Sequence, residues 1–178
     1  MPTRRIRHLG DPVLRQVSAP VADPRRESSL LDDLRSTLHD FQRTRGFGRG
    51  ISAVQIGEPK RLIYIEFEGA AYPLFNPRYS RQSGKTFELW DDCFSFPDLV
   101  VWVRRHESVS IRYQDELGVE RELTGTDSFS ELLQHEMDHL DGVLAIDHAV
   151  DANSLATRDE WLRRGAPGRR RWPEGERP

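Results

Sequence analysis

The stretch QHEMDHLDG, residues 134–142, constrains this chain more than any other part of its sequence. Two histidines lie four residues apart, and a glutamate follows the first. On a helix, His135 and His139 project from one face, close enough to hold a single metal ion, with Glu136 beside them. Chance matches to H-E-x-x-H occur on exposed helices, but leucines flank both histidines here, and unpaired imidazoles on an apolar face are costly. The stretch therefore predicts a helix that carries metal ligands.

Composition predicts one globular domain without disulfides or membrane spans. The chain has 178 residues, of which 37% are hydrophobic and 31% are charged. A net charge of -3 gives no electrostatic reason to expect a nucleic-acid or membrane partner. Cys93 is the single cysteine, so no intrachain disulfide can form, and no apolar run suggests a signal peptide or membrane span. We therefore expect a cytoplasmic protein.

Hydrophobic periodicity predicts strands followed by a core helix. Residues 28–46 show an apolar stripe at helical spacing, with Gly46 placed to end that helix. Residues 128–140 form the motif helix, which Gly142 is placed to end. Strands are predicted at residues 61–67, 71–77 (short and broken by prolines), 99–103, 108–114 and 119–124, the last two joined by a turn at 115–118. This order predicts an α+β fold, in which antiparallel sheets pack around the motif helix and a further helix lies near the N-terminus.

The sequence predicts one domain followed by a C-terminal segment of different composition. Residues 1–165 are expected to form one catalytic domain. Residues 166–178 lose apolar periodicity and gain glycine, proline and arginine, so they are predicted to form a disordered basic tail. Three consecutive arginines at 169–171 are more often a solvated end than an RNA contact.

The third metal ligand decides the chemistry, and the residues alone leave two alternatives. A metzincin would need a third histidine where Ala145 stands, so that pattern fails. A thermolysin-like peptidase would use a downstream carboxylate, for which Glu160 is available, although its neighbours are typical of an exposed helix. Cys93 is the other alternative, flanked by aromatic residues that predict partial burial, although a buried cysteine often serves only as a small hydrophobe.

Three stretches in order resemble the motifs of the peptide deformylases. They are GRGISAVQ at residues 48–55, DDCFS at 91–95 and QHEMDHLDG at 134–142. The family patterns are G-x-G-[apolar]-A-A-x-Q, E-G-C-[apolar]-S and Q-H-E-x-D-H-[apolar]-x-G. The third is complete here, and the resemblance covers roughly residues 8–150.

The resemblance implies that Cys93 is the third ligand beside His135 and His139. One thiolate and two imidazoles leave a fourth position open, as in catalytic metal sites. The resemblance implies Fe²⁺ as the metal, with Ni²⁺ or Co²⁺ as replacements, whereas general ligand chemistry favours Zn²⁺. Glu136 is expected to act as the general base.

Other site roles are implied by the same resemblance. The side-chain amide of Gln55 and the backbone N–H of Phe94 are expected to stabilise an oxyanion. The backbone of Gly50 and Ile51 is expected to pair with the substrate like an added strand. The implied reaction removes the N-formyl group from the N-terminal methionine of nascent polypeptides and releases formate. The implied partners are an N-formylated peptide and, as a candidate, the ribosome.

Departures from the motifs keep other functions open. Ser52 replaces alanine, Asp91 replaces glutamate, Asp92 replaces glycine, and Phe94 is bulkier than the usual aliphatic residue. These changes are compatible with a deformylase-like amidase for another N-formyl substrate. An inactive peptide-binding homologue is a further alternative, but an inactive copy has little reason to retain Glu136. Asp138 is expected either to orient a histidine or to be a surface charge.

Overall fold

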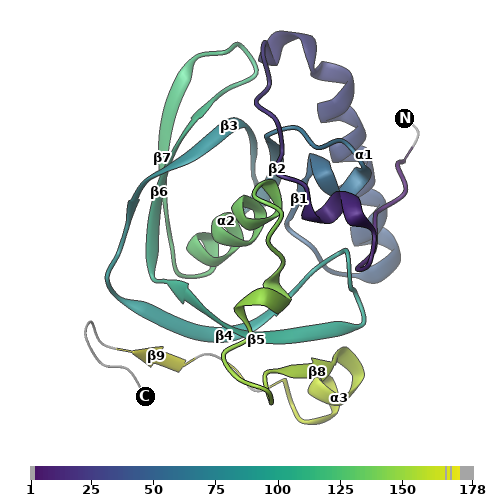
Figure 1. The fold of residues 1–178 in the computed structure, drawn as a ribbon, viewed down its shortest axis with the longest axis vertical. Coiled ribbons are helices and arrows are strands. Elements are labelled where there is room, and N and C mark those ends of the chain that lie inside the picture. The colour runs from purple at the N-terminus through teal and green to yellow at the C-terminus, as the bar shows by residue number, and fades with distance from the viewer. Residues whose placement is uncertain (1–2, 167, 169, 173–178) are drawn as a thin grey trace.

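Two antiparallel sheets enclose the helix that carries the two histidines (Figure 1). The computed structural model describes residues 3–166, 168 and 170–172. Its helices are α1 (Ser28–Arg45), α2 (Asp127–Leu140) and α3 (Arg158–Arg163), with 3₁₀ turns η1 (Pro12–Arg15), η2 (Pro24–Arg26), η3 (Ala53–Ile56) and η4 (Ala145–His148). Its strands are β1 (Gly50–Ser52), β2 (Leu62–Phe67), β3 (Ala70–Gln82), β4 (Thr86–Asp92), β5 (Leu99–His106), β6 (Ser108–Gln114), β7 (Glu120–Thr126), β8 (Leu155–Thr157) and β9 (Arg170–Trp172). The predicted α+β class is confirmed.

The sheets differ in size and in their relation to α2. One has the strand order β1-β2-β3-β6-β7, and the other β8-β5-β4-β9, with antiparallel pairing throughout. In Figure 1, α2 lies between them, while α1 lies on the side of β1 and β2. Because β1 is the end strand of its sheet, one of its edges is not used by β2.

Helix α2 is held by apolar packing on one side and by a polar contact on another. Leu133, Met137 and Leu140 are buried against residues of β2 and β6. Full burial of such a side chain contributes about 1.5–3 kcal/mol. Gln134, at the start of the motif, accepts a hydrogen bond from the backbone N–H of His106 (2.9 Å) and donates one to its carbonyl (3.0 Å). These contacts fix the rotation of the helix, and hence the direction of its histidines.

Helix α1 confirms the helix predicted near the N-terminus at residues 28–46. Leu34 and Leu38 are fully buried, and Phe41 is nearly so. Gly46 caps the helix in a left-handed conformation, with φ of 79°. Such a conformation favours glycine because it has no Cβ.

Several strands differ from the prediction, among them β1, β8 and β9, which the sequence does not predict. The strand predicted at residues 71–77 is not broken by its prolines but runs over Ala70–Gln82 as β3. Pairing with β6 begins only at Phe75, so Pro73 lies where one edge of β3 is unpaired, and Pro77 lies in a register shift. Strand β4 was not predicted, although it leads directly to Cys93.

The predicted tail lies largely outside the described residues. Within residues 166–178, a short strand, β9, pairs with β4. The predicted disorder and the domain boundary at residue 165 therefore stay predictions.

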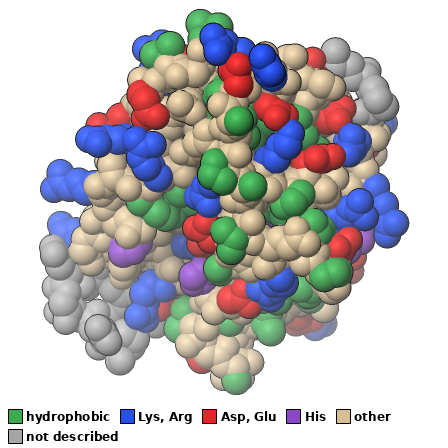
Figure 2. Space-filling model, turned by 45° about the horizontal axis from the view of Figure 1, so that its top comes forward, with side chains coloured by type: hydrophobic (Ala, Val, Ile, Leu, Met, Phe, Trp, Pro, Cys, Tyr) green, Lys and Arg blue, Asp and Glu red, His purple; other side chains and the backbone are tan. Residues whose placement is uncertain are grey.

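Surface charge and helix composition can be compared with the expectation of no nucleic-acid or membrane partner. Positive and negative side chains are interspersed over the face shown in Figure 2. In the part of the chain that the structure describes, no helix has the length and apolarity needed to cross a membrane.

Gly142, after α2, provides a test of the local packing. It has φ of +72°, and a Cβ there would lie 2.6 Å from the carbonyl oxygen of Arg15. Gly118 has a similar φ of +79°, but a Cβ at that position would meet nothing within 4 Å, so Gly118→Ala is the matched control. We expect Gly142→Ala to lower the free energy of unfolding, measured by chemical denaturation, by about 1–3 kcal/mol more than the control does. Equal losses would contradict this packing.

Candidate metal centre

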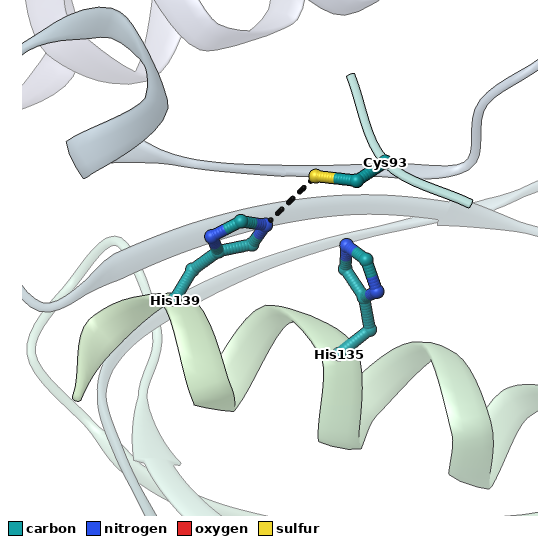
Figure 3. Close-up of side chains that lie close together, drawn as sticks. All are labelled: Cys93, His135 and His139. Carbon is teal, nitrogen blue, oxygen red and sulfur yellow. Dashed lines mark hydrogen bonds between the residues drawn. The ribbon is translucent and has the colours of Figure 1, made fainter. Parts of the chain in front are cut away.

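Three buried donor atoms converge between β4 and α2. Cys93 follows the last residue of β4, and its Sγ lies 3.2 Å from Nε2 of His139. The donor atoms of Cys93, His135 and His139 all lie within 4.8 Å of one another. Figure 3 shows both imidazoles rising from one face of α2 toward the sulfur. The helix brings together residues four apart, and the strand supplies a third donor from 42 positions before His135 in the sequence.

The chemistry of these donors fits a divalent metal ion. A tetrahedral site with bonds of about 2.0–2.3 Å holds its donors about 3.5 Å apart, similar to the spacing here. Burial lowers the pKa of His139 to about 3, so its ring is neutral, as a ligand must be. All three side chains are nearly inaccessible to solvent.

Asp91 fixes the orientation of His135. Its Oδ1 lies 2.8 Å from Nδ1 of His135, which leaves Nε2 available for a metal. Its Oδ2 accepts a hydrogen bond of 2.9 Å from Arg105. Burial alone would raise the pKa of Asp91, but His135 and Arg105 outweigh it and hold that pKa well below its usual value. Burial likewise opposes a charge on His135, yet the Asp91 carboxylate raises the pKa of His135 well above its ordinary value, so a metal ion held by Nε2 would have to displace a proton from that nitrogen.

Asp138 contacts this network from the far side of Arg105. Its Oδ2 lies 2.5 Å from Nη1 of Arg105 and 3.0 Å from Nε2 of His148. Asp138 therefore supports the arginine that holds Asp91, and it lies in the network rather than standing as an isolated surface charge.

Glu136 is buried, with 2% of its surface exposed. Its Oε2 accepts a hydrogen bond of 2.6 Å from the hydroxyl of Ser52. Burial raises the pKa of Glu136 to about 7, although the Ser52 contact opposes that shift. A Cβ on Gly50 would lie 2.7 Å from Oε1 of Glu136, so the carboxylate requires glycine there. The sequence identifies Ser52 only as a departure from the family motif, because its partner Glu136 lies 84 residues away.

Gln55 and Phe94 lie beside the same donors. The Ser52 backbone N–H donates to Oε1 of Gln55 (2.9 Å), which turns Nε2 toward Sγ of Cys93 (3.5 Å). No hydrogen bond among the described residues uses the backbone N–H of Phe94. The Phe94 ring stacks on Phe41, with centroids 3.8 Å apart. The side chain, bulkier than the usual aliphatic residue of the family, is therefore buried in the hydrophobic core.

A cavity of about 530 Å³ opens onto these groups. Its walls come from the segment before and within β1, from the end of β4 and from α2. It is lined by Phe47, Gly48, Arg49, Gly50, Gln55, Leu89, Trp90, Asp91, Asp92, Cys93, Phe94, Ser128, Glu131, Leu132, His135 and Glu136. Ile51 is fully buried and does not line the cavity, so only its backbone in β1 is placed to meet a peptide.

The alternative third ligand lies elsewhere. Glu160 is in α3, is partly exposed and forms an ion pair with Arg163. Among the described residues, the group of donors that includes both histidines contains Cys93 and not Glu160.

Comparison with known proteins decides the family. The family model for polypeptide deformylase matches residues 3–154. A curated peptide deformylase of Rhizobium meliloti (strain 1021) is 38% identical over 165 residues, covering 88% of each chain. The chain belongs to the polypeptide deformylase family. The expected resemblance is confirmed, as is the expectation of a deformylase enzyme.

Solved structures agree with this assignment of a deformylase. The peptide deformylase from Thermotoga maritima matches with a TM-score of 0.79 and 28% identity, covering 85% of this chain and 100% of that one. A class I type b peptide deformylase from Acinetobacter baumannii, solved with Met-Ala-Ser bound, matches with a TM-score of 0.73 and 26% identity, covering 83% and 98%. The comparisons give no support to a thermolysin-like peptidase or to an inactive homologue.

Metal retention tests the donor set. We expect Cys93→Ala to lose the bound metal ion during dialysis, because two imidazoles alone form an incomplete site. Glu160→Ala is the control, and we expect it to retain the ion. Metal per protein chain, measured by plasma mass spectrometry, distinguishes the two. Loss of metal from Glu160→Ala with retention in Cys93→Ala would assign the third ligand to the carboxylate instead.

Proposed function

We propose that this chain hydrolyses the N-formyl group of peptides, with Cys93, His135 and His139 as ligands of one divalent metal ion. The proposal rests on one observation: three buried donors of the right kind lie beside the buried carboxylate of Glu136. Membership of the polypeptide deformylase family supports the same reaction. The relative bound to Met-Ala-Ser supports a peptide substrate.

The metal is proposed to be Fe²⁺, as the family resemblance implies, although Zn²⁺ suits the same ligands. When bound, such an ion polarises a carbonyl and makes a water acidic near neutral pH. Asp91 keeps the proton on Nδ1 of His135 and so leaves the other nitrogen free as a ligand.

Glu136 is proposed to move the proton. With a pKa of about 7, it is partly ionised near neutrality and able to accept a proton from the attacking water. The water oxygen bonds to the formyl carbon, the C–N bond breaks, and the same proton passes from Glu136 to the departing amine nitrogen. Formate and a free amino terminus result. Ser52 holds Oε2, so Oε1, beside Gly50, is the oxygen placed for this transfer.

Two N–H donors are proposed to stabilise the oxyanion that forms on the formyl oxygen. Nε2 of Gln55 is aimed at the site by the hydrogen bond on its Oε1, and the N–H of Phe94 follows the Cys93 ligand directly. Loss of one such donor typically costs about 3 kcal/mol of transition-state stabilisation.

The peptide is proposed to lie along the edge of β1. There the backbone of Gly50 and Ile51 pairs with β2 on one side only, so an extended chain adds as a further strand. Methionine as first residue, contact with the ribosome and a cytoplasmic location remain predictions from the sequence.

Glu136→Gln tests the proton-transfer role. The amide keeps the volume of the side chain but accepts no proton at neutral pH. We expect metal content to stay normal and formate release from a formyl peptide to fall by about 10²–10⁴-fold. Glu122→Gln, on the exposed face of β7, serves as the control and should retain full activity. An active Glu136→Gln enzyme would rule out Glu136 as the general base.

A further inference from the structure

Arg158 contacts the wall of the cavity from outside the segment that the family model matches. That match ends at residue 154, and Arg158 is the first residue of α3. Strand β8, which leads into α3, pairs with β5, and the backbone N–H of Arg158 donates to the carbonyl of Asp98 (2.9 Å). Backbone pairing therefore fixes the point from which the Arg158 side chain extends.

The Arg158 guanidinium joins two walls of the cavity. Its Nη2 lies 2.6 Å from Oδ2 of Asp92, at the end of β4, and its Nε donates to the carbonyl of Pro97 (2.7 Å). The same group lies over the ring of Phe47, which precedes β1, with Cζ 3.8 Å from the ring centroid. Asp92 and Phe47 both line the cavity. Arg158 thus connects two wall residues that come from distant parts of the chain.

The segment that carries Phe47 has little backbone restraint of its own. It lies between the end of α1 and the start of β1. Two glycines with positive φ flank Phe47, Gly46 at 79° and Gly48 at 118°. Because glycine restricts the backbone less than any other residue, side-chain contacts must hold this segment in place.

Other side chains hold the same segment on the sides of α1 and α2. Nε2 of Gln42, on α1, donates to the carbonyl of Gly48 (3.1 Å). Nη2 of Arg49 lies 2.7 Å from Oε2 of Glu131 on α2. Arg158 supplies a polar link in the remaining direction, toward β4, so its loss would leave the cavity free to widen on that side.

The contacts of Arg158 depend on the shape of a guanidinium. The group is planar, so its face covers an aromatic ring while its edge donates to carboxylate and carbonyl oxygens. The Arg158 side chain is 18% exposed and that of Asp92 is 39% exposed. Asp92 stands where the family motif has glycine, so this ion pair is a feature of the present chain rather than of the motif.

We propose that Arg158 is a positioning residue that holds the segment before β1 close to the end of β4 and so maintains the width of the peptide cavity. The inference rests on the proposed deformylase function, in which the peptide lies along β1. Arg158 does not line the cavity, so it acts through Asp92 and Phe47. Its loss should weaken peptide binding without slowing the chemical step.

Arg158→Met tests this role in the complete, Fe²⁺-loaded enzyme, because methionine keeps an unbranched side chain without charge or N–H donors. We expect KM for formyl-Met-Ala-Ser to rise about tenfold and kcat to change by less than about twofold, with normal metal content. Arg163→Met removes an exposed pair with Glu160 on the same helix and is the matched control, which should keep its KM. An unchanged KM in a folded, metal-loaded Arg158→Met enzyme would overturn the inference, as would a fall in kcat alone.

Two further variants separate positioning from a general loss of stability. Arg158→Lys keeps a charge beside Asp92 but has no planar group to cover Phe47, so we expect an intermediate KM. The same variant carries the comparison should Arg158→Met not fold. In an Asp92→Gly background, which restores the family residue, Arg158→Met should raise KM by a smaller factor. An equal factor in both backgrounds would overturn the inference, because Arg158 would then not act through Asp92.

Equilibrium binding distinguishes this inference from the proposed function. Met-Ala-Ser carries no formyl group, so its dissociation constant, measured by calorimetry, reports binding without turnover. We expect Arg158→Met to raise that constant about tenfold. If the unmodified enzyme released no formate but bound Met-Ala-Ser more tightly than Arg158→Met does, the proposed function would fail and the inference would stand. Equal dissociation constants, or no binding by either protein, would overturn the inference.

Discussion

The buried carboxylate of Asp91 is the contact on which the site depends. It joins three elements, because it lies on β4 and binds Arg105 of β5 and His135 of α2. A buried charge of this kind is stable only when its oxygens are fully paired, and removal of one partner typically costs about 3–5 kcal/mol. The network therefore connects β4, which leads to Cys93, with α2, which carries the histidines. It fixes the relative positions of the three donors.

The chemistry of the site follows from the burial of its polar side chains. Burial gives Glu136 a pKa near neutrality, and Ser52 fixes one of its oxygens. Gly50 leaves room for the other oxygen, which a side chain at that position would displace. The same edge strand that supplies Gly50 also presents backbone for an extended peptide, so proton transfer and substrate alignment are built on one segment.

Part of this site could be predicted from the sequence, because part of it is local. The spacing of His135 and His139 on an amphipathic helix predicts two ligands through helical geometry alone. Their third partner, Cys93, could be chosen over Glu160 only through the family resemblance, since no local rule relates a strand end to a distant helix. Strand β4 was missed because Asp91, which is buried in it, is a strongly polar residue that becomes stable there only through its distant partners. The same holds for the ion pair of Arg49 and Glu131, whose members are 82 residues apart.

X-ray absorption spectroscopy of the metal-loaded protein would test the central claim most directly, because it counts the ligand types around the ion. We expect one sulfur at about 2.3 Å and two imidazole nitrogens at about 2.0–2.1 Å when the metal is Zn²⁺. The sulfur contribution can come only from Cys93 or a methionine, and its loss in Cys93→Ser would assign it. A first shell of nitrogen and oxygen alone would contradict the account, because Cys93 would then be a buried thiol beside a different kind of metal site.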